Sequence, residues 1–199
     1  MRVRLYIEGG ADRSSLHIKC REGFRKLLER AGFLGRMPSI KACGTRNAAY
    51  DDFKTALDAA APGEYPILPV DSEAPVNQPA WEHLQSRDGW QQPDGAEGDQ
   101  AQLMVQCMET WCVADRQALR EFFGHRLREG VLPALDDLEA KTKDSVQDSP
   151  VNATRDCGFQ MGYMKGKRSF ELLGQLNPAE LKKHLPHFER LCEMLSAKL

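Results

Sequence analysis

The first seventy residues show two alternating patterns of hydrophobic and polar positions. Residues 2–8, RVRLYIE, alternate and are rich in β-forming side chains, which predicts a strand. Residues 14–31 place apolar side chains at helical spacing opposite a basic face, which predicts a helix ended by Gly32. The patterns then repeat as a strand at 37–44, a helix at 45–60 and a strand at 64–70. This β-α-β-α-β order is typical of a parallel sheet with crossover helices.

The pattern is less regular after residue 80. Residues 81–100 read as a short helix followed by a Gly/Pro/Asp-rich loop. Residues 101–106 predict a fourth strand, although residues 101–107 also fit a helix, and 107–124 predict a helix with a break near Asp115. The two prolines of 64–70 favour an edge or irregular strand. Beyond residue 125 we expect a more polar helical region, with a loop at 146–158 and two or three helices at 167–199.

These elements predict an α/β fold in two parts. We expect a Rossmann-like parallel sheet flanked by helices over residues 1–124, with a helical C-terminal appendage over 125–199 packed on it. The 199 residues suffice for one domain with a real core.

Composition and charge narrow the class of protein. Hydrophobic residues make up 41% and charged residues 28% of the chain, as in ordinary soluble globular proteins. The net charge of −2 supplies no overall basic field that would attract nucleic acid. The six cysteines form no CxxC pair and are best explained as free thiols in a reducing compartment. With neither a signal peptide pattern nor an apolar run of membrane-spanning length, we expect a cytoplasmic protein.

Acidic side chains follow two of the predicted strands. Glu8 ends the first strand, and Asp71 and Glu73 follow the third within VDSE. The carboxyl ends of parallel strands share one edge of a sheet, so these three carboxylates are expected to converge there. Clustered carboxylates repel one another, and a hard divalent cation such as Mg²⁺ relieves that repulsion through oxygen ligands. The alternative is that each acid is a solvated loop residue or a helix cap.

These motifs resemble the Toprim domain over roughly residues 1–110. The likeness rests on EGGAD at 8–12 and DSE at 71–73. With CGTRNAAYDDF, WEHLQSRDGW, LMVQCMETW and KGKRSFELLG, the whole chain resembles small bacterial Toprim-like proteins, some called RloB-like, which are often encoded beside ABC or OLD-like ATPases. The resemblance implies a Mg²⁺- or Mn²⁺-dependent nuclease linked to anti-phage defence. Glu73 departs from the usual aspartate, which leaves the number of metal ions open.

Within this interpretation each candidate has an expected role. Asp71 and Glu73 bind metal, and Glu8 binds metal or acts as a general base. Asp12 either caps the first helix or supports the metal ligands. Glu109, in the apolar context CMETWCV, is either a fourth carboxylate or the partner of an arginine.

Cations are expected to hold the phosphates of a substrate. Arg46 follows the second strand on the same edge as the acids, next to the start of a helix with free N–H groups. In YMKGKRS, Lys165 is a candidate catalytic residue, Lys167 and Arg168 are candidate nucleic-acid contacts, and Tyr163 is a candidate for stacking on a base. The alternative is a solvated charge run.

Three functions are compatible with the sequence. The first is a metal-dependent nuclease acting on DNA or RNA, and the second is a catalytically weak Toprim-like subunit that docks on a partner ATPase. The third is a hydrolase of small nucleotides or phosphate esters. The chain has no Walker A motif, so any ATP hydrolysis is expected to come from another protein.

Overall fold

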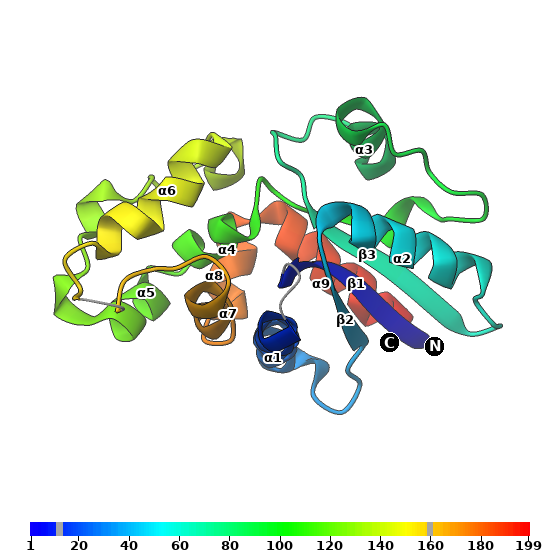
Figure 1. The fold of residues 1–199 in the computed structure, drawn as a ribbon, viewed down its shortest axis with the longest axis horizontal. Helices are drawn as coiled ribbons and strands as arrows, with labels where there is room; N and C mark the ends of the chain where they lie inside the picture. Colours follow the sequence, from blue (N-terminus) through cyan, green and yellow to red (C-terminus); the bar gives the residue numbers. More distant parts are fainter. Residues whose placement is uncertain (11–13, 159–160) are drawn as a thin grey trace.

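The computed structural model describes residues 1–10, 14–158 and 161–199. Four strands form one all-parallel sheet in the order β2-β1-β3-β4 (Figure 1). The strands are β1 (Arg2–Gly10), β2 (Ser39–Gly44), β3 (Glu64–Asp71) and β4 (Ala101–Met104). The predicted α/β fold with a parallel sheet flanked by helices is therefore confirmed.

The helices cover both faces of this sheet. On one face α1 (Ser14–Leu28) packs against β1 and against α7 (Lys167–Leu173), and α9 (Pro186–Lys198) packs against β4. The core cluster on this face includes Val3, Leu5 and Ile7 of β1. On the other face α2 (Arg46–Asp58) and α3 (Ala80–Asp88) pack against Tyr6 and the apolar side chains of β3 and β4. This division follows from the strand pattern, since successive side chains of β1 point to opposite faces.

The chain reverses its winding direction between β1 and β3. From β1 it crosses over α1 to β2 on one side, and from β2 it crosses over α2 to β3 on the other side of β1. The carboxyl ends of β1 and β3 therefore flank a topological switch point, where open α/β sheets bind their ligands.

β3 is an interior strand, so of the two alternatives predicted from its prolines, an edge or an irregular strand, the edge is wrong. It pairs with β1 over Glu64–Ile67 and with β4 over Leu68–Asp71. In a parallel strand, successive residues direct their N–H groups to alternate neighbours. The backbone of Pro66 is directed toward the β4 side of the strand, at a level that β4 does not reach. There Gln100 Nε2 donates a hydrogen bond to the carbonyl of Pro66 at 2.8 Å. Pro69 faces β1 after that pairing has ended, so neither proline removes a ladder hydrogen bond.

The region after the sheet is helical. It contains α4 (Met108–Ala114), α5 (Arg116–Phe123), α6 (Lys143–Thr154), α7, α8 (Pro178–His184) and α9. Short turns of other helix types occur at Glu29–Phe33, Gly98–Gln100, Gly124–Arg126, Glu129–Val131 and Leu138–Ala140. The predicted break near Asp115 is present, because its carboxylate accepts a hydrogen bond from Ala118 N at 2.9 Å and caps α5.

The predicted loop at 146–158 is wrong over most of its length, because α6 occupies Lys143–Thr154. Thr142 caps this helix, and Pro150 lies inside it. Proline has no N–H to offer the carbonyl of Val146, but Ser149 Oγ donates to that carbonyl at 3.0 Å. The neighbouring serine thus supplies the hydrogen bond that the proline removes.

The C-terminal helices share a hydrophobic core with the sheet. One continuous cluster contains Leu5 and Phe24 from the N-terminal part together with Val146, Leu173 and Phe188 from beyond residue 124. The division of the chain at residue 124 stays a prediction. No helix among the described residues is long and apolar enough to cross a lipid bilayer.

Candidate functional site

A cavity of about 420 Å³ lies at the switch point, and we call it the acid cavity. Its walls come from the ends of β1 and β2, the starts of α1, α2, α4 and α7, and the last residues of β3 and β4. Its five charged lining residues were all singled out from the sequence, namely Glu8, Arg46, Asp71, Glu109 and Lys165. The side chains of Leu16, Met104, Met108 and Phe170 form its apolar part.

Glu8 and Asp71 lie on two strands that are no longer paired at this level. The β1–β3 ladder ends at Leu5 and Ile67, so both acids lie beyond it. Burial raises the pKa of Glu8, and the nearby Arg46 offsets this only in part. Burial raises the pKa of Asp71 well above its usual range, and the charges of Glu8 and Glu109 raise it further. Two mutually repelling carboxylates, the half-buried Glu8 and the buried Asp71, therefore line one cavity.

Asp71 is held in place by the start of α4. Its Oδ1 accepts a hydrogen bond from Met108 N at 2.9 Å, and its side chain is almost completely buried. The next residue of α4, Glu109, is 1% exposed and also lines the cavity. The turn between β4 and α4 thus brings the acid of one strand next to the acid of a helix.

Glu109 has a tyrosine, not an arginine, as its partner. Tyr163 Oη donates to Glu109 Oε1 at 3.0 Å, and among the described residues Glu109 Oε2 is buried without a hydrogen-bond partner. The expected arginine pairing is therefore wrong within the described part of the chain. The prediction that Tyr163 stacks on a base is not supported, since its ring is buried and its hydroxyl is bound.

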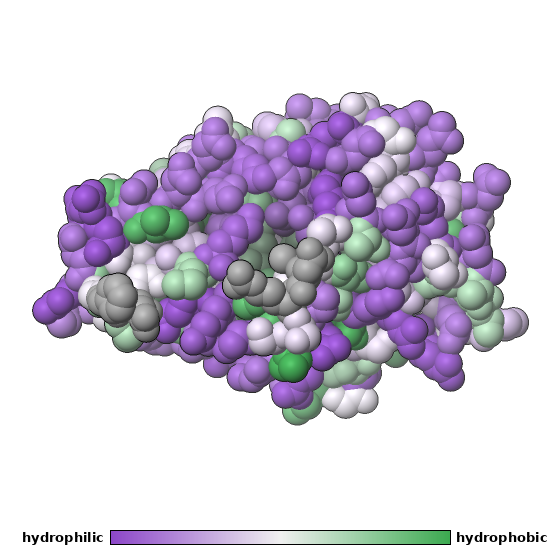
Figure 2. Space-filling model, viewed as in Figure 1, coloured by the Kyte–Doolittle hydropathy of each residue, from purple (hydrophilic) through white to green (hydrophobic). Residues whose placement is uncertain are grey.

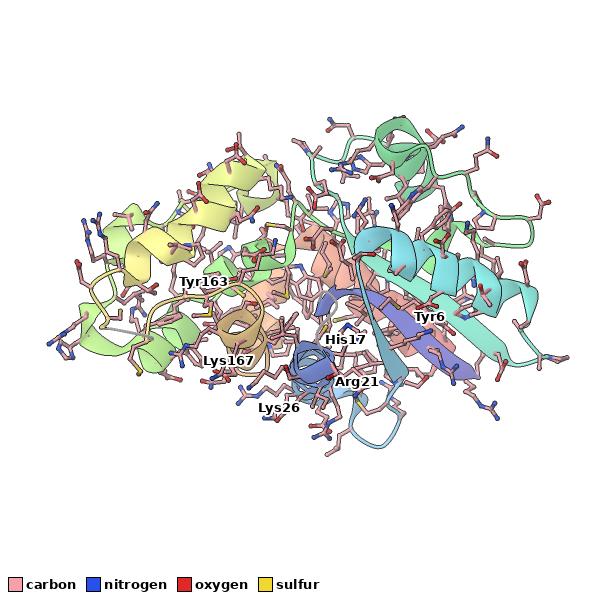
Figure 3. All side chains as sticks on the ribbon, in the orientation of Figure 1. Tyr6, His17, Arg21, Lys26, Tyr163 and Lys167 are labelled. Carbon is pink, nitrogen blue, oxygen red and sulfur yellow. The ribbon has the colours of Figure 1, made fainter. Side chains whose placement is uncertain are left out.

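Lys165 brings a positive charge to the acid cavity from the segment that leads into α7. Desolvation lowers the pKa of Lys165, but the charges of Glu109 and Asp71 outweigh it and the pKa is raised above the ordinary value. Lys165 is exposed, so its ammonium group is accessible to a ligand in the cavity. Its neighbours Tyr163 and Lys167 are labelled in Figure 3 on the same segment.

Glu73 differs from the other acids. It does not line the cavity, and its Oε2 pairs with Lys143 and, at 3.3 Å, with Arg87. Its backbone has a positive φ of 64°, which is uncommon for a residue with a side chain. Nothing in the sequence indicated the pairing with Lys143, which lies 70 residues away.

Arg46 lines the acid cavity, but its donors are engaged within the protein. Nε and Nη2 donate to the carboxylate of Asp88 at 3.1 and 2.7 Å, and Nη1 donates to the carbonyl of Asp71. Nη1 also lies 3.5 Å from Glu8 Oε2, and the guanidinium lies 4.9 Å from the ring centre of Trp90. Arg46 thus bridges the unpaired ends of β1 and β3. No pattern in the sequence indicated Asp88 as its partner.

The remaining candidates lie elsewhere. Lys167 is exposed and does not line the cavity. Arg168 packs its guanidinium over the rings of Phe122 and Phe123, at 4.4 and 5.6 Å from their centres, which suits a structural contact with α5. Asp12 lies outside the described residues.

The donor chemistry of the cavity fits a hard cation. Over residues 1–10, 14–158 and 161–199, no three His, Cys, Asp or Glu side chains come close enough to hold a metal ion between them. Mg²⁺ is nevertheless commonly bound by one or two carboxylates, with water and phosphate oxygens as its other ligands. Glu8 and Asp71 supply such carboxylates, and the unpartnered Oε2 of Glu109 is a further hard oxygen.

Fold and cavity together define an α/β protein with an acidic cavity at the switch point of a parallel sheet. The family model described as "Domain of unknown function (DUF4276)" matches residues 7–196, nearly the whole chain, so the chain belongs to that family. No curated protein and no solved structure matches it.

Proposed function

We propose that this protein is a Mg²⁺- or Mn²⁺-dependent nuclease that hydrolyses phosphodiester bonds of DNA or RNA, as its resemblance to Toprim proteins implies. The observation that carries the proposal is the meeting of Glu8, Asp71, Glu109 and Lys165 in one cavity at the switch point. Carboxylates from two strands and a helix repel one another when they lie close together, which is unfavourable for a purely structural role.

The proposed mechanism assigns a task to each residue. Glu8 and Asp71 would hold the metal ion, with Glu109 as a further candidate ligand. The bound ion would stabilise charge on the phosphate and lower the pKa of a water molecule. Lys165, kept protonated by its acidic neighbours, donates hydrogen bonds to non-bridging phosphate oxygens. If Glu8 is not a ligand, its raised pKa suits a general base.

Glycines allow a phosphate to approach the backbone of the site. Gly10 has a φ of 92°, and a Cβ atom there would lie 2.9 Å from His17 N, so no larger residue fits without rearrangement. Gly44 and Thr45 line the cavity at the start of α2, where unpaired N–H groups favour an anion. Thr45 itself caps this helix, since its Oγ1 accepts a hydrogen bond from Ala48 N at 3.3 Å.

We further propose that an ABC- or OLD-like ATPase partner controls this activity in anti-phage defence. Two features of the chain support a partner, namely its lack of a nucleotide-binding motif and its net charge of −2. The alternative is a catalytically weak subunit whose task is to dock on the ATPase.

The test is cleavage of labelled DNA and tRNA by the purified chain, with Mg²⁺, Mn²⁺ or EDTA, and with or without the ATPase encoded beside it. We expect cation-dependent products that require or are strongly enhanced by the ATPase. Complex formation without products under any condition would favour the docking alternative. Products in EDTA would contradict the metal assignment.

A further inference from the structure

A second cavity, which we call the cationic cleft, lies at the other end of the helices that line the acid cavity. Its volume is about 660 Å³, and its walls include Arg30 after α1, Ala114 at the end of α4 and Gln175 after α7. The starts of the same three helices line the acid cavity. The two sites are thus separated by the length of α4, roughly 10 Å for seven residues.

The carboxylates that line the cationic cleft already have hydrogen-bond or ion-pair partners within the protein. The two carboxylate oxygens of Asp115 accept hydrogen bonds from Ala118 N and Asn177 N, at 2.9 and 2.7 Å. Glu121 accepts a hydrogen bond from Gln117 at 2.7 Å. Glu180 has Lys183 and His184 within 3.9 Å. These acids are therefore anchored by the protein itself.

Two donors of the cleft remain unused. Arg116 Nη2 donates to the carbonyl of Pro133, but Nη1 is buried and has no acceptor among the described residues. His184 Nε2 is also buried without a hydrogen bond there, since its 3.9 Å contact with Glu180 is too long to be one. Arg116 is half-buried, and this burial lowers its pKa although the charge of Glu129 acts in the opposite direction.

The other arginines of the cleft differ from Arg116. Arg120 makes two hydrogen bonds with Glu129, at 2.6 and 2.9 Å. Arg30 Nη1 donates to the carbonyl of Gln175 at 2.9 Å. Only the guanidinium of Arg116, among these three, keeps a buried N–H without an acceptor in the described structure.

We propose that the cationic cleft is a second ligand site, which binds a phosphate group through Arg116 and His184. A phosphate offers several acceptor oxygens, and its negative charge would pair with the half-buried guanidinium of Arg116. The volume of the cleft exceeds what a lone phosphate fills and suits a nucleotide-sized ligand. The phosphate can belong to a free nucleotide or to a nucleic-acid backbone. This site is independent of the acid cavity and of the activity proposed for it.

The test compares thermal stabilisation and binding by inorganic phosphate, adenosine 5′-monophosphate and a short oligonucleotide without terminal phosphates. EDTA keeps the acid cavity free of divalent cations, and chloride at equal ionic strength is the reference. Binding of the first two ligands alone identifies a free phosphate compound, and binding of the oligonucleotide identifies a backbone. We expect Arg116→Gln to weaken binding about tenfold or more, as the loss of a charge-assisted hydrogen bond predicts.

Arg190→Gln is the matched control, because it removes the same charge from an exposed position on α9 outside the cleft. It should bind like the wild type. If Arg116→Gln does not fold, His184→Gln tests the same cleft and should also weaken binding. The proposal is overturned if the wild type binds none of the three ligands, or if the folded cleft variant binds them with unchanged Kd.

Discussion

The acid cavity and the cationic cleft lie at opposite ends of α4 and carry opposite charges. At the first end Glu109 has an unpartnered buried oxygen, and just beyond the second end Arg116 has an unpartnered buried N–H, both among the described residues. In each case one buried atom of the side chain lacks the hydrogen bond that burial normally requires, while another atom of the same group has one. If the two proposals above are correct, the charge of the unsatisfied group selects the ligand, a cation at one end and an anion at the other. The hydrophilic face in Figure 2 does not by itself distinguish the two sites.

The largest effect is expected for the acid cavity. Asp71→Asn should reduce cation-dependent cleavage at least about 10³-fold, because it removes a charged candidate ligand. The melting temperature should stay equal or rise, since the asparagine keeps an acceptor for Met108 N and relieves charge repulsion. Activity assays and thermal melts measure both.

The matched control is Asp94→Asn, which changes an exposed aspartate in the loop after α3. It should change neither the cleavage rate nor the melting temperature. Full cleavage by Asp71→Asn would rule out the proposed role of this carboxylate. A large loss of stability would show that the acid is structural.

Lys165→Met should reduce cleavage about 10²-fold through loss of a cation near the phosphate. It should also move the acidic limb of the pH–rate profile to higher pH. The charge of Lys165 lowers the pKa values of Glu8 and Asp71, so its removal raises both and delays their ionisation. Lys167→Met is the control, because it changes an exposed lysine outside the cavity, and it should leave the cleavage rate and the pH–rate profile unchanged. An equal loss of cleavage rate for the two lysine variants would contradict a specific role for Lys165.

Substitutions of Arg46 and Arg116 test the comparison of the two sites through their effects on the free energy of unfolding. Arg46→Met should cost about 1–3 kcal/mol, because Asp88 and the carbonyl of Asp71 lose charge-assisted hydrogen bonds. Arg116→Gln should cost less, or stabilise the protein, because it removes a buried charge without a carboxylate partner. Urea unfolding in phosphate-free buffer measures both. Equal destabilisation would show that Arg116 is satisfied within the protein.

The smallest effect is a pH dependence of stability without divalent cations. Glu8 and Asp71 have raised pKa values in the folded state, so the folded protein binds more protons than the unfolded chain above their ordinary values of 4.5 and 3.8. Their contribution to stability therefore falls as the pH rises through this interval, and is constant above the folded pKa values. Denaturation at several pH values should show a weaker decrease for Asp71→Asn than for the wild type. An identical slope would indicate that folding does not raise the pKa of Asp71.

Sequence reasoning located the fold because periodicity is a local signal. The alternation in β1 and the helical spacing in α1 and α2 identified the elements, and the shared edge of parallel strands brought Glu8 and Asp71 to one place. It failed where a side-chain hydrogen bond compensates for an unfavourable proline. Gln100 satisfies the carbonyl of Pro66 within the interior of the sheet, and Ser149 replaces the hydrogen bond lost at Pro150.

The side-chain partners of the site were not predictable for a related reason. Tyr163 reaches Glu109 across 54 residues, and Asp88 reaches Arg46 across 42. No periodic pattern links positions so far apart, because such pairs follow from the packing of whole elements. The sequence predicted that an acid lies at a strand end, but it did not predict which side chains contact that acid.

The short ladder between β1 and β3 has a mechanical consequence. These strands are joined only over Arg2–Leu5 and Glu64–Ile67, while β1 stays paired with β2, and β3 with β4, up to the cavity. The sheet is thus two ribbons fused at one end, with Glu8 on one ribbon and Asp71 on the other. The separation of the two carboxylates therefore depends on how far the two ribbons diverge. Arg46 connects the ribbons across this opening, because its Nη1 contacts both the carbonyl of Asp71 and, at 3.5 Å, Glu8 Oε2.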